Sequence, residues 1–252
     1  MRHTAHVQPG AYLDHLADDG ARLVAAARSA GTDAPVPTCP GWQVADLLVH
    51  TARVFRHKAH VLEHHLQERP ADGWQVADPG PADAPAFFEG ELRALLVALR
   101  AADPAEQVWT FAPADRTVAF WCRRMAHEAA IHRVDAEAAA GTPGPVHPEL
   151  AIDGIDEVLH LFLAPRVGAA ALGTPAATVH LHATDVPGEW LVGLGPDGLR
   201  VERGHAKGDA AVRGTASALL LWLWGRLRLD ALEVFGEERA ATRLRAAAAT
   251  AT

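Results

Sequence analysis

The segment Gly141–Pro145 is the strongest candidate for a domain boundary in this sequence. Gly141, Pro143, Gly144 and Pro145 lie within five positions. Proline removes a backbone donor and clashes inside a helix, and glycine weakens one, so no helix continues through this segment. A chain of 252 residues has enough apolar material for two modest domains. We therefore predict one domain over residues 1–143 and a second over residues 144–252.

Helical periodicity characterises the residues before this break. Apolar side chains recur at helical spacings, and loops rich in proline and glycine separate the periodic segments. The predicted helices are Tyr12–Ser29, Val44–Gln67, Phe87–Ala101 and Thr117–Ala140. Four such helices with polar outer faces predict a bundle, in which we expect the first two helices to pair.

The pattern changes after the break. A predicted helix over Glu149–Leu163 is followed by segments of alternating apolar residues, which are typical of strands. The predicted strands form a meander over Thr178–Ala183, Glu189–Leu194, Leu199–Arg203 and Ala210–Arg213. An apolar helix over Thr215–Arg228 should cover one face of the sheet, and an alanine-rich helix should close the chain. The expected fold class is α+β, a four-helix bundle followed by a small α/β domain with a mainly antiparallel sheet.

Composition excludes several classes of protein. The 31 acidic residues outnumber the 23 Lys and Arg residues, which argues against a nucleic-acid partner. No apolar run approaches the roughly 20 residues of a membrane span, and the first ten residues lack the pattern of a secretory signal. Cys39 and Cys122 are too few for a disulfide framework, and we expect both to pack as small hydrophobic residues. We expect a cytoplasmic monomer or small homo-oligomer.

The fourth predicted helix carries two metal-ligand residues at helical spacing. Glu128 and His132 are four positions apart, so their side chains leave the same face one turn apart. A catalytic zinc takes three protein ligands from histidine and carboxylate side chains. His50, on the second predicted helix, is the third candidate, because ligands converge from facing helices of a bundle. His127 is rotated by about 100° from Glu128 and is expected to pack or to face solvent.

Spacing alone leaves alternatives open. A glutamate and a histidine four residues apart also form surface ion pairs on many helices. Among the 15 histidines is a rival cluster on a face that we expect to be solvated: His57, His60, His64 and His65. These lie two or more turns beyond His50, too far to share its ion. His180 and His182 share one face of a predicted strand, which is compatible with metal binding, but we expect that face to be solvated.

Three stretches resemble signatures of the mycothiol-dependent maleylpyruvate isomerase family, in the DinB-like superfamily. They are Pro40–His50, Arg124–Glu137 and Ala210–Arg226, which occur in the family's order and span nearly the whole chain. The third is similar to the family's C-terminal domain, which resembles sterol-carrier folds. The resemblance implies a DinB-like bundle and a sterol-carrier-like second domain. It also implies zinc, or another divalent metal, bound by His50, Glu128 and His132.

The resemblance further implies thiol chemistry. Mycothiol would be the thiol cosubstrate, and the metal would activate it for isomerisation of, or S-transfer to, a small electrophilic substrate. Neither cysteine of the chain is needed as the nucleophile. Two alternatives remain: a small-ligand-binding module with a structural or vestigial metal site, and a thiol-independent, metal-dependent hydrolase.

Relatives place an arginine of the second domain at the active site. Arg226 is the best match and the expected catalytic residue, with Arg213 and Arg228 as the nearest alternatives. Its guanidinium would bind a carboxylate through two parallel hydrogen bonds. The other interpretation is that Arg226 caps a helix end. Asp135, one turn beyond His132, could hydrogen-bond near the metal site or pair with an arginine.

Overall fold

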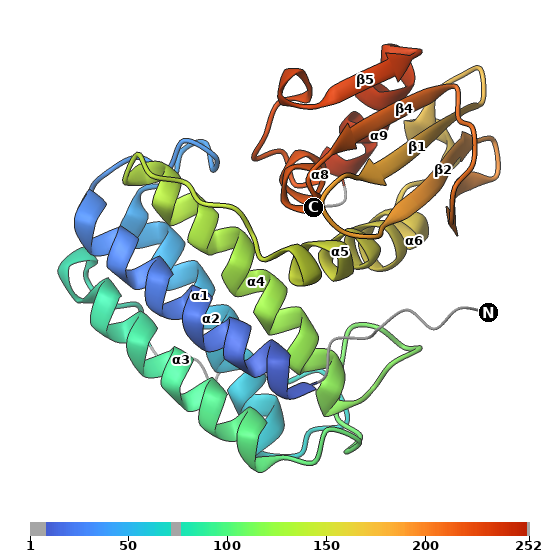
Figure 1. Ribbon diagram of the computed structural model, residues 1–252. Coiled ribbons are helices and arrows are strands. Elements are labelled where there is room, and N and C mark those ends of the chain that lie inside the picture. Colours follow the sequence, from blue (N-terminus) through green and yellow to red (C-terminus); the bar gives the residue numbers. More distant parts are fainter. Residues whose placement is uncertain (1–8, 72–76, 251–252) are drawn as a thin grey trace. The chain divides into compact units, whose positions relative to one another are not determined.

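The computed structural model describes residues 9–71 and 77–250. The chain forms two compact units, Met1–Gly144 and Pro145–Thr252, and each is described here by itself. Within the described part of the first unit, four long helices form a bundle (Figure 1). They are α1 (Pro9–Ala30), α2 (Val44–Glu63), α3 (Ala84–Ala101) and α4 (Val118–Ala139).

Helices α1, α2 and α3 each bury an apolar stripe, whereas α4 is buried over most of its surface and lacks the predicted polar outer face. Leu16 and Leu23 of α1, Leu48 and Phe55 of α2, and Leu95 of α3 are completely inaccessible to solvent. Helix α1 packs mainly against α4, and α2 packs mainly against α3. The expected pairing of the first two helices is therefore wrong, because helices that follow one another in the chain need not make the largest contact.

Local signals explain where α2 and α4 begin and where α2 ends. Asp46 accepts a hydrogen bond from the backbone of Gln43 at the start of α2, and Thr117 accepts one from Phe120 at the start of α4. Helix α2 ends at Glu63, four residues before the predicted end at Gln67. His65 adopts a positive φ of 47°, which ends the helix without the glycine or proline that sequence patterns rely on.

An ionic network inside the bundle joins α1, α4 and the last residue of the unit. Arg133 is fully buried, and its guanidinium donates to Asp19, to Glu137 and to the carbonyl oxygen of Gly144 at 3.0, 2.7 and 3.0 Å. The amide of Gly144 in turn donates to Glu137 at 2.8 Å. A side chain at position 144 would meet the Arg22 guanidinium at 3.1 Å, so this close approach favours glycine.

The second unit is a mixed sheet flanked by helices. Helix α5 (Pro148–Glu157) continues as a π-helical stretch, Val158–Leu163, and as the short helix α6 (Ala164–Arg166), after which comes α7 (Ala169–Leu172). In the described part of the chain the strand order is β3-β2-β1-β4-β5. The strands are β1 (Ala177–Ala183), β2 (Glu189–Gly195), β3 (Gly198–Arg203), β4 (Ala210–Gly214) and β5 (Glu233–Gly236). Helices α8 (Ala216–Leu223) and α9 (Glu238–Ala249) both contact β1 and β4 (Figure 1).

The predicted fold class is confirmed, but the predicted meander is only partly right. Strands β1, β2 and β3 do form antiparallel neighbours. Strand β4 instead returns to the other side of β1 and pairs with it in parallel, and β5, which the sequence analysis missed, pairs antiparallel with β4. The apolar helix also ends at Leu223, before Gly225, rather than at Arg228. Among the described helices, none has the length and apolarity needed to cross a bilayer.

Candidate metal centre

The three predicted metal ligands meet between α2 and α4. The Nε2 atom of His50 lies 3.7 Å from Oε1 of Glu128, and the Nε2 atom of His132 lies 3.4 Å from the same oxygen. The three candidate donor atoms all lie within 4.8 Å of one another. Glu128 and His132 are nearly buried, whereas 43% of the His50 side chain is exposed. The group is therefore accessible from the side of His50.

The two oxygens of Glu128 face different partners. While Oε1 faces both histidines, Oε2 forms a short contact with the guanidinium of Arg124, one turn earlier on α4. Burial alone would raise the pKa of Glu128, but Arg124 and the two histidines lower it well below its ordinary value. The carboxylate is thus ionised and held in place, with one oxygen available to a cation.

His132 is fixed from its other ring nitrogen. Its Nδ1 atom lies 2.9 Å from Oδ2 of the fully buried Asp135, whose Oδ1 accepts a hydrogen bond from the hydroxyl of Thr38 at 2.6 Å. Asp135 therefore makes the hydrogen bond near the site that was one of its two predicted roles. Burial lowers the pKa of His132, but hydrogen bonds to Asp135 and Glu128 outweigh it and raise that pKa to about 9. A metal ion would have to displace this proton.

The arrangement fits a divalent ion. In a tetrahedral zinc site, bonds of about 2.0–2.1 Å place the donor atoms about 3.3 Å apart. The separations of 3.7 and 3.4 Å to Glu128 come within a few tenths of an ångström of that value. Two imidazoles and one carboxylate are a donor set of catalytic zinc sites, and a carboxylate behind a ligating histidine is the usual supporting contact.

The sequence analysis did not predict several residues that lie near this centre. The ring of Trp42 lies 5.0 Å from that of His50, so Trp42 packs on a candidate ligand. Lys58 lies with its ammonium 5.0 Å from the ring centre of Trp121, and burial lowers the pKa of Lys58 to about 8. Glu128 opposes that shift. Such contacts depend on how helices are rotated about their axes, which spacing within one helix does not reveal.

Among the described residues, the other histidines of the bundle are not part of this group. His127 is buried and contacts the ring of Tyr12, as expected of a packing residue. In the rival cluster the rings of His60 and His64 lie 4.5 Å apart, and His65 contacts Glu106. Within residues 9–71 and 77–250, no third ligand joins that pair to form a metal-binding group.

Neither cysteine has the character of an activated nucleophile. Cys122 is buried, and burial raises the pKa of its thiol to about 11. Cys39 is half-buried rather than fully buried as predicted, and its sulfur lies 3.5 Å from Oδ2 of Asp135. A nearby carboxylate does not favour a thiolate.

Arg226 lies in the second unit, just after α8. Its Nη1 donates to the carbonyl oxygen of Trp224 at 2.8 Å, which is the contact that a helix C-terminal cap makes. A neighbouring arginine, Arg245, is half-buried, and its Nη1 atom has no hydrogen-bond partner in the described part of the chain. Burial, and to a smaller extent the charge of Arg226, lowers the pKa of Arg245. Arg213 and Arg228, the alternative candidates, pair with Glu233 and Asp230.

Comparisons with known proteins agree with this architecture. Residues 13–137 match the family model for the mycothiol maleylpyruvate isomerase N-terminal domain, and residues 149–243 match the model for the C-terminal domain of the same enzymes. No functionally curated protein matches the sequence. A crystal structure of the mycothiol-dependent maleylpyruvate isomerase superposes with a TM-score of 0.64 at 13% identity, covering 94% of this chain and 97% of that one.

A histidine-to-alanine mutant of that isomerase superposes with a TM-score of 0.66 at 14% identity, again covering 94% of this chain and 97% of that one. At such low identity the superposition shows a shared fold. The two family models, however, cover both units in the order in which they occur along the chain. The chain therefore belongs to the mycothiol-dependent maleylpyruvate isomerase family.

Proposed function

We propose that the protein binds a divalent ion, zinc in the first instance, through His50, Glu128 and His132, and that it uses mycothiol to isomerise a small electrophile. One observation carries this proposal: Nε2 atoms from two different helices face a single oxygen of a buried carboxylate, at 3.7 and 3.4 Å. Three protein ligands would leave one position of a tetrahedral ion for a thiol or substrate.

The residues around the centre would each have a distinct task. Asp135 holds the ring of His132 so that Nε2 faces the centre, and Thr38 holds Asp135. Arg124 keeps one oxygen of Glu128 turned away, which leaves the other as a single ligand. When bound, the ion would lower the pKa of a thiol that reaches its open position.

The proposed reaction conserves every atom of the substrate. The thiolate sulfur of the cosubstrate adds to a carbon–carbon double bond conjugated to a carbonyl, whose oxygen takes up the displaced electron pair as an enolate, and the former double bond can then rotate. The enolate returns this electron pair when the thiolate leaves. Cleavage of the new carbon–sulfur bond releases the thiol and leaves the trans isomer. The high pKa of Cys122 supports an external thiol as the nucleophile. S-transfer to an electrophile would use the first half of this sequence alone.

We expect zinc-loaded protein to isomerise maleylpyruvate when mycothiol is present and to leave it unchanged when no thiol is added. Loss of substrate and formation of the trans product are followed by absorbance and chromatography. Cobalt-loaded protein should also gain the near-ultraviolet absorption of a cobalt–thiolate pair when mycothiol is added. A cobalt spectrum that saturating mycothiol leaves unchanged would contradict thiol activation. Loss of substrate without thiol, with cleavage products in place of the trans isomer, would indicate a hydrolase.

We also propose that Arg226 binds a carboxylate of the substrate or cosubstrate. Arg245 supports this, because its buried Nη1 has no hydrogen-bond partner among the described residues and lies in a side chain next to a second guanidinium, which favours an anion. Arg226→Lys keeps the charge but loses the paired donors, so we expect kcat/KM to fall roughly 10-fold to 100-fold, with metal content unchanged. Arg228→Lys, in an exposed ion pair, is the matched control. Unchanged kinetics in Arg226→Lys would leave Arg226 as a helix cap only.

A further inference from the structure

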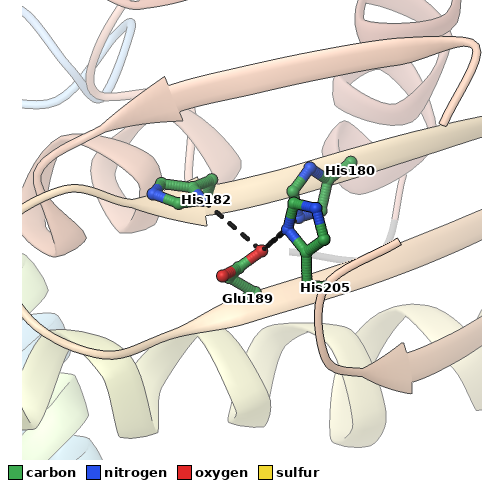
Figure 2. A group of neighbouring side chains, drawn as sticks. All are labelled: His180, His182, Glu189 and His205. Carbon is green, nitrogen blue, oxygen red and sulfur yellow. Dashed lines mark hydrogen bonds and ion pairs between the residues drawn. The ribbon is translucent and has the colours of Figure 1, made fainter. Parts of the chain in front are cut away.

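A second group of metal-ligand side chains lies in the C-terminal unit, on the sheet (Figure 2). His180 and His182 are two residues apart on β1, so both point to the same face. Glu189 of β2 is the direct cross-strand partner of His182 and lies on that face as well. His205 comes from the loop after β3. Contrary to expectation, this face is not simply solvated, because only 7% of the His180 side chain is exposed.

The four side chains converge on one point (Figure 2). Oxygen Oε2 of Glu189 lies 2.8 Å from Nε2 of His180, 2.7 Å from Nδ1 of His205 and 3.4 Å from Nδ1 of His182. All four donor atoms lie within 4.8 Å of one another. The donor separations of a tetrahedral zinc site, about 3.3 Å, fall inside this range. Small side-chain rotations would therefore suffice to place an ion between them.

The sheet holds this geometry in place before any ion arrives. The ladder between β1 and β2 fixes three of the four residues, and β3 pairs with β2 as far as Arg203, opposite Trp190. The amide of Gly204 then donates to the carbonyl oxygen of Glu189 at 3.0 Å. Gly204 has a φ of 132°, which only glycine adopts readily, and the turn delivers His205 to the cluster.

We propose that His180, His182, Glu189 and His205 form a second divalent-metal site, distinct from the centre in the bundle and closed by four protein ligands. Three imidazoles and one carboxylate select ions such as zinc, cobalt, nickel or copper over magnesium and calcium. Four protein ligands are typical of a structural site. Since 80% of the His205 side chain is exposed, the ion would anchor the β3–β4 loop, residues 204–209, to the sheet.

The test titrates zinc alone into the metal-free, full-length chain carrying His132→Ala, which disables the bundle centre. We expect one ion per chain to bind, and His180→Ala, Glu189→Gln or His205→Ala to weaken that binding by at least about 100-fold, because loss of an outer-shell partner already costs 10–100-fold. Hydrogen exchange of the amides of residues 204–209 should slow by at least about 10-fold on zinc addition, and only with the cluster intact.

Two controls keep the result interpretable. His160→Ala removes an exposed histidine of the same unit and should leave zinc affinity unchanged. His205→Ala removes a side chain that is 80% exposed, so its fold, checked by circular dichroism, should match that of the parent. Zinc binding of equal affinity in the parent and in the three cluster variants would overturn the proposal. The proposal would also be overturned if magnesium at the same concentration abolished zinc binding. Neither result depends on whether the bundle centre binds a metal.

Discussion

Glu128→Gln is expected to remove the metal ion from the bundle and, with it, the thiol-dependent activity. The substitution keeps the shape of the side chain but removes the charge, and glutamine offers only a neutral oxygen between His50 and His132. The loss of a direct ligand should weaken metal binding by at least about 100-fold. Arg124 and Lys58 would then face the site without their anion, which opposes a dication further. Elemental analysis and the maleylpyruvate assay measure both effects.

The measurement is cleanest in a chain that also carries His205→Ala, so that any zinc in the C-terminal cluster does not mask the loss. His60→Ala is the matched control, since His60 lies on the same helix as His50 but outside the candidate centre. Its metal content and activity should equal those of the parent. Full metal content in Glu128→Gln, His50→Ala and His132→Ala would rule out the proposed centre.

Arg133→Met is expected to produce the largest loss of stability. Methionine fits the apolar part of the space, but Asp19 and the carbonyl oxygen of Gly144 lose the guanidinium that donates to them, and Glu137 keeps only Arg22 and the amide of Gly144. Burial already raises the pKa of Asp19 with Arg133 beside it, so water does not readily replace the guanidinium. Removing one partner of a buried ionic group typically costs about 3–5 kcal/mol. Native-state hydrogen exchange of the α4 amides reports this loss for the bundle alone.

Arg28→Met tests whether burial of the ionic network is the cause of the stability loss expected for Arg133→Met. Arg28 also makes paired hydrogen bonds, to Glu89, at 2.8 and 2.9 Å, but this ion pair is exposed. Water can solvate the carboxylate that the substitution leaves behind, so exchange of the α4 amides should be nearly unchanged. If both variants lost equal stability, the buried network would have no special role.

Sequence periodicity located the elements better than it located their partners. All four bundle helices and the first four strands overlap their predicted ranges, because apolar spacing is a local property. The parallel pairing of β4 with β1 is not local, since it depends on which edge of the sheet the chain reaches after residues 204–209. The short strand β5 also carries too little alternation over four residues to be recognised.

For the two candidate metal sites, too, local contacts could be predicted from the sequence and non-local contacts could not. Glu128 and His132 could be paired from their spacing on one helix, and His50 was added because bundle helices face one another; the structure does bring the three together. Arg124 and Trp42 were missed, because their contacts depend on helix rotation and rotamer. In the sheet, the alternation of residues along the strand predicted that His180 and His182 share a face. It did not predict that Glu189 and His205 join them, because their positions depend on strand register and on the conformation of a loop.

The Arg133 network also bears on the order in which this chain can fold as it is synthesised. Asp19 leaves the ribosome early, but its partner Arg133 follows 114 residues later, and Gly144 later still. Until then α1 lacks its main packing partner, α4, and its buried carboxylate lacks its counter-charge. The nascent bundle therefore remains incomplete until the domain junction has emerged. Arg133 can then complete the network between α1 and Gly144, the last residue of the unit.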